Sequence, residues 1–333
     1  LERIVGEGGM GVVWAATHVL TGKSCALKFL KGQRASDPRN HARLLNEARA
    51  ACRVRHPNVA QVHDILELAN GAPFIVMDLL DGEPLSTRLG RRGALGMAET
   101  LAIVLPAISA VAAAHELGIV HRDLKPDNIF LERGPDGVDV VKVLDFGIAK
   151  HFDPGLASDV NEGTRASVPL RGGLTTTYSA VGTPSYMAPE QLHADGEIGA
   201  AADVWSLGIV LFECLTGARP ARDETTMSVD LADARRALDA RGVPNEVADL
   251  VIRMMSADPA ARPSLADVEQ QLRPHRPRQA STGELAAVAA FAPATSTPWS
   301  ARWRWVVSAV GVAALGAFGL QRVGASAADV PRP

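Results

Sequence analysis

Apolar positions in the N-terminal part of the chain follow the short, alternating pattern of β-strands. The predicted strands are residues 4–5, 12–14, 26–30, 59–68 and 74–79, the last two joined at Asn70-Gly71. A helical pattern covers residues 41–54. After Gly82 the pattern becomes mainly helical, with apolar spacings of three and four over residues 101–117 and several more helices over residues 187–272. The sequence therefore predicts an α+β fold in which a β-rich lobe precedes an α-rich lobe, with a cleft between them.

The two ends of the chain differ from its middle. Residues 1–5 resemble the interior of a strand, so we expect an N-terminal part to be missing. Residues 274–302 are rich in Pro, Ala, Ser and Thr and predict a disordered linker. The 18 residues 303–320 are apolar after a Trp-Arg-Trp start. They span about 27 Å as a helix, a short fit to a bilayer core of about 30 Å. We expect one transmembrane helix there and a short tail over residues 321–333; a buried or interfacial helix is the alternative.

Small residues recur on the predicted membrane helix. Ala309, Ala313 and Ala317 lie four positions apart, a spacing that favours close packing of two helices and thus a homodimer. Alanines that simply face lipid explain the same pattern equally well.

Composition and charge narrow the classes of function. Of 333 residues, 47% are hydrophobic and 21% are charged, which excludes a disordered or fibrous chain. Lys and Arg number 34 and Asp and Glu 37, a net charge of −3, so no basic surface indicates nucleic acid as a partner. The cysteines, Cys25, Cys52 and Cys214, lack metal-binding spacing, and we expect them to be small buried hydrophobic residues.

A glycine-rich turn lies between the first two predicted strands. Residues 6–13 read Gly-Glu-Gly-Gly-Met-Gly-Val-Val, and glycines let backbone amides approach phosphate oxygens. A strand follows this motif, so it does not fit a dinucleotide-binding loop, which precedes a helix. Lys28 lies in the next apolar strand, where its ammonium suits α- and β-phosphates, with Glu47 as its orienting anion. Taken alone, these features also fit a plain hairpin, an edge-strand lysine and a solvated glutamate.

The strongest chemical signal is the run His121-Arg122-Asp123-Leu124-Lys125-Pro126-Asp127-Asn128. Asp123 can accept the proton of a substrate hydroxyl and orient its oxygen. Lys125 can neutralise charge on a phosphoryl group in transfer, and Asn128 offers an uncharged oxygen to a hard cation. The run matches the catalytic-loop pattern H-R-D-L-x-x-x-N of protein kinases, and this resemblance implies phosphoryl transfer.

Two further motifs frame a long segment. Asp145-Phe146-Gly147 follows a strand-like stretch, and a carboxylate at a strand end is a good ligand for magnesium. Ala188-Pro189-Glu190 closes the segment, which is polar and contains Gly and Thr over residues 153–174.

With its motifs in this order, the chain resembles a protein kinase, specifically the bacterial eukaryotic-like (Hanks-type) transmembrane serine/threonine kinases. The resemblance covers residues 4–272. Three further motifs carry it: His56-Pro57-Asn58, Gly182-Thr183-Pro184 and Asp203-Val204-Trp205-Ser206-Leu207-Gly208.

The resemblance implies the two-lobed protein-kinase fold over residues 1–273, with an N-lobe at 1–79 and a C-lobe at 80–273. It implies transfer of the ATP γ-phosphate to Ser or Thr hydroxyls of proteins, with ATP and Mg2+ as cofactors. An ion pair between Arg262 and Glu190 also follows from it. Because ATP is cytosolic, the kinase domain is expected to face the cytoplasm from a single membrane span.

The resemblance also gives each motif a role in the site. Asp123 and Lys125 are expected to be catalytic, and Asn128 and Asp145 to bind the metal. Met77 corresponds to the gatekeeper, before a hinge whose backbone binds adenine. The residues expected to bind the nucleotide are Val5, Gly6, Glu7, Gly8, Gly9, Met10, Gly11, Val12, Val13, Ala26, Lys28, Glu47, Asp78 and Leu80.

Regulation is expected on the segment before Gly182. Thr175 and Thr177 match the usual autophosphorylation sites, and a phosphate there can pair with Arg122 and order the loop. A Thr-rich loop without a switch is the alternative. Two other functions compete with a protein kinase: a pseudokinase that only binds, disfavoured by the complete set of motif residues, and a kinase of small molecules, disfavoured by Lys125 and the Ala188-Pro189-Glu190 segment.

Overall fold

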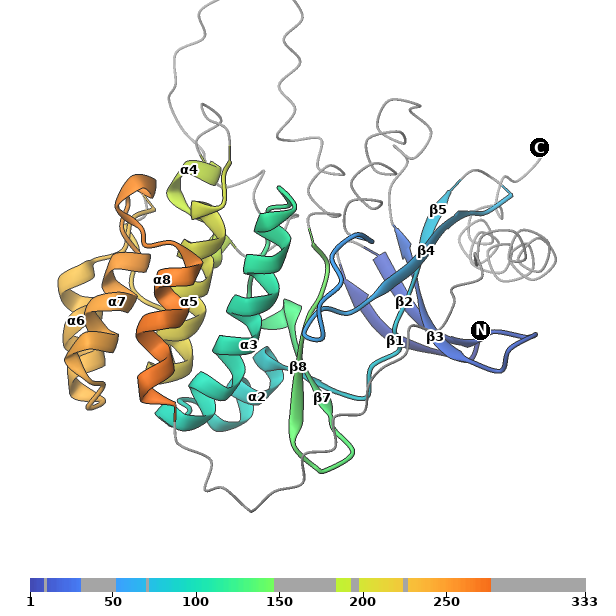
Figure 1. Ribbon diagram of the computed structural model, residues 1–333, viewed down its shortest axis with the longest axis horizontal. Helices are drawn as coiled ribbons and strands as arrows, with labels where there is room; N and C mark the ends of the chain where they lie inside the picture. The colour runs from blue at the N-terminus through green and yellow to red at the C-terminus, as the bar shows by residue number, and fades with distance from the viewer. Residues whose placement is uncertain are drawn as a thin grey trace, which may run out of the picture.

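Two lobes of different architecture lie side by side in the computed structural model, with the sheet-rich lobe on the right of Figure 1 and the helical lobe on the left. The structure describes residues 1–8, 11–30, 52–69, 72–146, 184–192, 198–223 and 227–276. The two-lobed fold expected from the sequence is therefore present in the described part of the chain.

The N-lobe is an antiparallel sheet in the order β1-β2-β3-β5-β4. Its strands are β1 (Arg3–Gly8), β2 (Gly11–Thr17), β3 (Ser24–Leu30), β4 (Val62–Glu67) and β5 (Pro73–Met77). Side chains alternate between the two faces of a strand, so Cys25 and Leu27 pack with Phe74 in the core of this lobe. The same alternation sends Ala26 and Lys28 to the opposite face.

A second, smaller sheet lies at the junction of the lobes, where the sequence pattern predicted mainly helix. It has the order β6-β7-β8, with β6 (Gly82–Pro84), β7 (Ile129–Arg133) and β8 (Asp139–Val143). Gly82 has a φ of 159°, and a Cβ there would lie 2.0 Å from the Leu131 carbonyl oxygen, so only glycine fits. β8 coincides with the strand-like stretch expected before Asp145, whereas local periodicity did not reveal the short strands β6 and β7.

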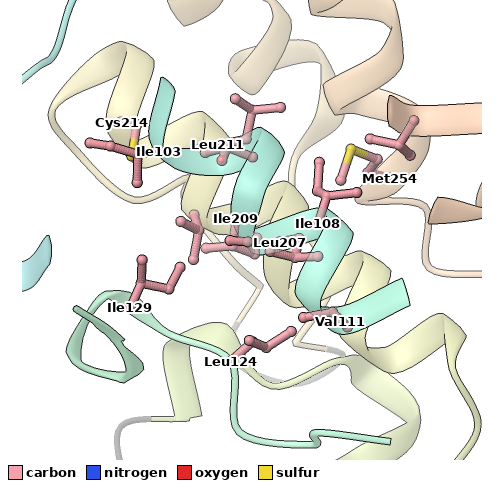
Figure 2. Close-up of a cluster of buried hydrophobic side chains, with 14 of the residues drawn as sticks. Ile103, Ile108, Val111, Leu124, Ile129, Leu207, Ile209, Leu211, Cys214 and Met254 are labelled. Atoms are coloured by element: carbon pink, nitrogen blue, oxygen red, sulfur yellow. The ribbon is translucent and has the colours of Figure 1, made fainter. Parts of the chain in front are cut away.

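Two helices, α3 (Met97–Glu116) and α5 (Ala201–Thr216), contribute the most buried residues to the C-lobe. Its other helices are α2 (Leu85–Arg92), α4 (Pro189–Leu192), α6 (Leu231–Ala240), α7 (Asn245–Met254) and α8 (Leu265–Leu272). Figure 2 shows Ile108 of α3, Leu207 of α5 and Met254 of α7 in one apolar cluster. A Cβ on Gly208 would lie 2.9 Å from the Met254 Cβ, so glycine allows α5 and α7 to approach closely.

Short 3-10 helices connect these elements: η2 (Pro126–Asn128), η5 (Pro184–Tyr186), η6 (Pro259–Ala261) and η7 (Arg273–His275). The helix predicted over residues 41–54 lies mostly outside the described residues, and its last part, residues 52–54, is a turn rather than helix. Cys25 and Cys214 are buried, as expected, and Cys52 is half-buried.

The predicted linker beyond residue 276 and the predicted membrane helix lie outside the described residues. Within the described ranges, one helix, α3, is long and apolar enough to cross a membrane. It packs against α5 and α8 in the core of the C-lobe, and half of its residues are buried, which accounts for its composition.

Candidate active site

The predicted catalytic loop, residues 121–128, is held by a buried carboxylate at the start of α5. Asp203 Oδ2 accepts hydrogen bonds from the His121 backbone N–H and from His115 Nε2, both at 2.8 Å. Its Oδ1 accepts the Arg122 N–H at 2.8 Å. Asp203 has 0% exposure, so these bonds compensate the loss of hydration of its charge and fix the loop backbone.

Two residues of the site have strained backbone conformations. Arg122 has a φ of 64° and Asp145 a φ of 56°, a region that costs a non-glycine residue about 1–3 kcal/mol. Arg122 is secured on both sides, because its N–H donates to Asp203 and its carbonyl accepts from Gln191 Nε2 at 2.9 Å. The surrounding hydrogen bonds thus hold the loop in a shape that it would not adopt alone.

The side chains predicted to be catalytic converge on Asp123. Lys125 Nζ lies 3.0 Å from Asp123 Oδ2. Asn128 Nδ2 donates to the same oxygen at 3.1 Å and to the Asp123 carbonyl at 2.7 Å. Since the amide nitrogen of Asn128 faces Asp123, its amide oxygen is the atom that can bind a cation.

The imidazole of His121 links this loop to the strand that leads to Asp145. Its Nε2 donates to the Leu144 carbonyl at 2.7 Å, and its Nδ1 accepts the Asp123 N–H at 3.3 Å. A carbonyl can only accept and a backbone N–H can only donate, so the ring carries its proton on Nε2. The Leu144 N–H in turn donates to the Asn128 carbonyl at 2.9 Å.

Lys28 joins the two lobes by an ion pair. Its Nζ lies 2.6 Å from Asp145 Oδ2, and the lysine is only 5% exposed. β3 lies between β2 and β5, which excludes the explanation of Lys28 as an edge-strand residue. Glu47, the partner expected from the sequence, lies outside the described residues, so its pairing with Lys28 stays a prediction.

The environment of Asp145 suits a hard cation. Burial alone would raise the pKa of Asp145, but the adjacent ammonium of Lys28 outweighs burial and holds that pKa below its usual range. The carboxylate is therefore ionised at neutral pH. The described residues contain no group of three or more His, Cys, Asp or Glu side chains able to enclose a metal ion. One carboxylate and one amide oxygen fit Mg2+, which keeps waters and takes further ligands from substrate phosphates.

The predicted glycine-rich loop is the turn of the β1–β2 hairpin. Gly8 pairs with Gly11 and Glu7 with Val12, while Gly9 and Met10 between them lie outside the described residues. A bulge between Ile4 and Gly6 falls at Val5. Val13 pairs with Lys28 on β3, which places the hairpin beside the lysine.

The predicted hinge begins at the end of β5. Met77 pairs with Ala26 across the sheet, so both lie near Lys28. The side chain of Asp78 accepts from the Gln61 N–H at 2.9 Å and lies 2.8 Å from His63 Nε2. Burial opposes ionisation of Asp78, but these hydrogen bonds prevail and lower its pKa.

A small cavity of about 10 Å³, enough for roughly one water molecule, lies behind the predicted gatekeeper. Its lining residues are Val59, Ala60, Val62, Ile75, Met77, Asp145 and Phe146. The cavity therefore lies between the sheet of the N-lobe and the Asp145-Phe146 pair.

The ion pair expected between Arg262 and Glu190 is confirmed. Arg262 Nη1 and Nη2 contact the two oxygens of Glu190 at 2.6 and 2.8 Å, a bidentate arrangement. This pair anchors α4 and the end of the Ala188-Pro189-Glu190 motif to the C-lobe.

Of the predicted regulatory residues, the structure describes Arg122. Thr175 and Thr177 lie outside the described residues. Arg122 Nε is buried and has no hydrogen-bond partner among the described residues. A guanidinium nitrogen in that situation is suited to an incoming anion.

Sequence reasoning missed the roles of Asp203 and His115. Asp203 was noted only as part of a motif, and His115 was treated as one position of an apolar helix. The available signal was a carboxylate in an otherwise apolar helix, which must be paired when buried. Which groups pair with it could not be known before α3, α5 and the loop were placed together.

Comparisons with known proteins agree with this geometry. Residues 1–272 match the family model described as the protein kinase domain. The serine/threonine-protein kinase pkn3 of Myxococcus xanthus is 35% identical over 275 residues, which cover 80% of this chain and 48% of that protein. The serine/threonine-protein kinase PknA of Mycobacterium tuberculosis is 34% identical over 310 residues, covering 89% of this chain and 67% of PknA.

The fold matches solved kinase structures as well. The crystal structure of the Mycobacterium tuberculosis PknI kinase domain has a TM-score of 0.60 at 26% identity, covering 82% of this chain and 94% of that one. The chain spans about half the length of pkn3. On the match over residues 1–272 and the relatedness to bacterial serine/threonine kinases, this chain belongs to the protein kinase family.

Proposed function

We propose that this chain is a serine/threonine protein kinase that transfers the γ-phosphate of ATP to hydroxyls of protein substrates. One observation carries the proposal: Lys28 from the N-lobe forms an ion pair with Asp145, close to a cluster of catalytic-loop side chains. That cluster consists of Asp123, Lys125 and Asn128. The Asn128 carbonyl accepts a hydrogen bond from Leu144, the residue before Asp145. This arrangement suits phosphoryl transfer, because catalysis of that reaction is mainly positioning and charge neutralisation.

The roles follow from the contacts. Asp123 Oδ2 is already held by two donors, so the carboxylate is oriented to accept the proton of the substrate hydroxyl. The hydroxyl oxygen forms a bond to the γ-phosphorus as the bond to the ADP oxygen breaks. Lys125 lies beside Asp123 and neutralises charge on the phosphoryl group. When ATP binds, the ammonium of Lys28 contacts the α- and β-phosphates, either in place of Asp145 or in addition to it.

Asn128 and Asp145 would hold Mg2+, and the ion would supply charge neutralisation of the phosphate oxygens when bound. The nucleotide-binding roles of the β1–β2 hairpin, of Ala26, and of the hinge at Asp78 and Leu80 belong to the same proposal.

Phosphate transfer from labelled ATP to myelin basic protein tests the function directly. The wild-type chain is expected to label Ser or Thr, and Asp123→Asn to lower kcat by about 10²–10⁴-fold while binding an ATP analogue normally. Absence of transfer by the wild type would favour a pseudokinase. Phosphoamino-acid analysis that found no phosphoserine or phosphothreonine would favour a kinase of small molecules.

Activation by autophosphorylation extends the proposal. A phosphate on Thr175 or Thr177 supplies the anion that the buried Arg122 Nε lacks among the described residues. The double variant Thr175→Ala/Thr177→Ala should then have a lower rate than the phosphorylated wild type. An equal rate, in protein whose phosphates have been mapped, would refute the switch.

Membrane attachment through residues 303–320, with the kinase domain in the cytoplasm, is also proposed. The support is the apolar run with flanking tryptophans in the sequence. Removal of residues 303–333 should move the chain from the membrane to the soluble fraction. Substitution of Ala313 by Leu should weaken cross-linking of a homodimer if the small residues pack two helices together.

A further inference from the structure

A half-buried arginine outside the predicted site, Arg222, holds the segment that precedes α4. Arg222 Nη1 donates to the Ser185 carbonyl at 3.1 Å, and its Nη2 donates to the Met187 carbonyl at 2.9 Å. Its Nε donates to the Met227 carbonyl at 2.6 Å. One planar guanidinium thus joins two separate stretches of backbone, a task for which the single ammonium of lysine lacks the geometry.

The carbonyl of Tyr186, between those of Ser185 and Met187, also accepts a hydrogen bond from a side chain. Ser206 Oγ of α5 donates to the Tyr186 carbonyl at 2.9 Å, and the Tyr186 hydroxyl donates to Glu213 at 2.6 Å. Three consecutive carbonyls, at residues 185, 186 and 187, therefore accept hydrogen bonds from side chains of the C-lobe. The end of η5 and the residue after it are thus fixed to the C-lobe by side chains.

The position of Arg222 is unusual for a charged group. Its guanidinium lies 5.2 Å from the ring centroid of Trp205, which is fully buried. Burial lowers the pKa of Arg222 to about 10, so the side chain stays charged at neutral pH. A charge kept in such a place is retained for the hydrogen bonds that it makes, since an apolar residue would fill the space at no cost of hydration.

The segment held by Arg222 leads directly to the catalytic loop. The Ala188 N–H donates to Gln191 Oε1 at 2.9 Å, and Gln191 Nε2 donates to the Arg122 carbonyl at 2.9 Å. Arg122 is the residue before Asp123. The backbone of residues 185–187 is therefore placed relative to the proposed base by a short series of hydrogen bonds, without any contact to Lys28 or Asp145.

We propose that Arg222 is a positioning residue for the protein substrate. It holds residues 185–187 as a preformed surface on which the polypeptide around the accepting Ser or Thr lies beside Asp123. The inference rests on the proposed kinase function and adds a residue that the motifs do not contain. It requires that loss of Arg222 affect the protein substrate and leave the nucleotide side of the site intact.

The test compares the wild-type chain with Arg222→Met and Arg222→Lys, using myelin basic protein and ATP. Arg222→Met is expected to raise KM for the protein by about 10- to 100-fold, the loss of one or two hydrogen bonds from a charged donor. KM for ATP, and ATP hydrolysis without protein substrate, are expected to stay within about twofold. Arg222→Lys keeps the positive charge near Trp205 but loses the several donors of the planar guanidinium, and is expected to give an intermediate KM for the protein. Arg236→Met, which removes an exposed arginine of α6, is the control and should match the wild type in both assays.

The outcomes separate this inference from the proposed function. An unchanged KM for the protein in both variants, with normal transfer by the wild type, would overturn the role of Arg222 alone. A proportional loss of ATP hydrolysis and protein phosphorylation in Arg222→Lys, which is the variant expected to fold, would also overturn it, because a general loss of structure would explain both. If the wild type transferred no phosphate, the proposed function would fall, and the role of Arg222 with it.

Discussion

The two sides of the proposed site are held in different ways. On the C-lobe side, the backbone of the catalytic loop is bonded to Asp203, which is buried and uses both oxygens. On the N-lobe side, Lys28 reaches the C-lobe through one ion pair with Asp145, whose side chain is 21% exposed. The side proposed to perform proton transfer is thus part of the folded core. The side proposed to bind phosphate depends on a contact that a nucleotide can replace.

This difference follows from what each side has to do. A base and its supporting groups are most effective when their geometry is fixed before the substrate arrives. A phosphate-binding lysine instead has to exchange partners as nucleotide enters and leaves. Predictions on Asp203, Lys28 and Glu83 probe the contrast, from the largest expected effect to the smallest.

Removal of the Asp203 carboxylate should lower the stability of the fold the most. Asp203→Ala leaves two backbone N–H groups and His115 without their acceptor in the core, and we expect the free energy of unfolding to fall by about 3–5 kcal/mol. Urea unfolding followed by tryptophan fluorescence measures this, since Trp205 lies on the same helix. Asp203→Asn keeps one acceptor oxygen and should lose less. A drop of under about 1 kcal/mol in the alanine variant would show that the loop is not anchored to the core as described.

Replacement of Lys28 should spare stability and remove activity. Lys28→Met eliminates the positive charge beside Asp145, and we expect kcat/KM for ATP to fall by about 10²–10³-fold, because one electrostatic contact to the phosphates is lost. Its unfolding free energy should change far less than that of Asp203→Ala, since the freed carboxylate is partly solvated. A loss of stability equal to that of Asp203→Ala would erase the contrast between the two sides.

Acid should weaken the ion pairs between β6 and α2, with a smaller effect on the free energy of unfolding. Glu83 on β6 accepts from Arg91 and Arg88, and these hydrogen bonds lower its pKa from 4.5 to about 2. A carboxyl with a lowered pKa stabilises the fold above its unfolded pKa, and this contribution is lost as the pH falls from about 4.5 to 2.

Solvent screening at this site reduces the expected effect to about 1 kcal/mol. Thermal unfolding between pH 6 and pH 3 should therefore show a shallower decline in Glu83→Gln than in the wild type. Parallel curves for the two proteins would mean that the pair with Arg91 and Arg88 adds nothing to stability.

The order of the motifs made the fold and the catalytic cluster predictable, because each chemically necessary residue lies in a local pattern. Asp123, Lys125 and Asn128 are close in sequence, so a single loop brings them together. Lys28 could be placed on a strand by its apolar neighbours. Its contact with Asp145 could not be predicted, since it crosses between lobes that are far apart in the sequence.

Residues that act through long-range contacts escaped sequence reasoning. Asp203 and Arg222 lie far along the chain from the segments that they hold, and their neighbours in sequence are ordinary helix and loop residues. The pairing of β6 with β7 was missed for a similar reason, because Gly82, Glu83 and Pro84 pair with Glu132, Leu131 and Phe130, far along the chain. Pairing of that kind depends on the tertiary fold rather than on local periodicity.

The segment before β4 has a consequence for how the lobes can move. Asn58 and Ala60 exchange backbone hydrogen bonds with Val143 of β8, at 2.7 and 3.0 Å. Within the described residues, the chain passes from this contact with β8 into the N-lobe sheet after Ala60 and leaves the sheet again at Asp78, whose N–H donates to the Gln61 carbonyl at 3.1 Å. Because these two segments are bonded to each other, we expect the lobes to rotate about them, since a sliding displacement would break the bonds. Release of ADP from the proposed site is accordingly expected to involve a rotation whose axis lies beside the predicted hinge.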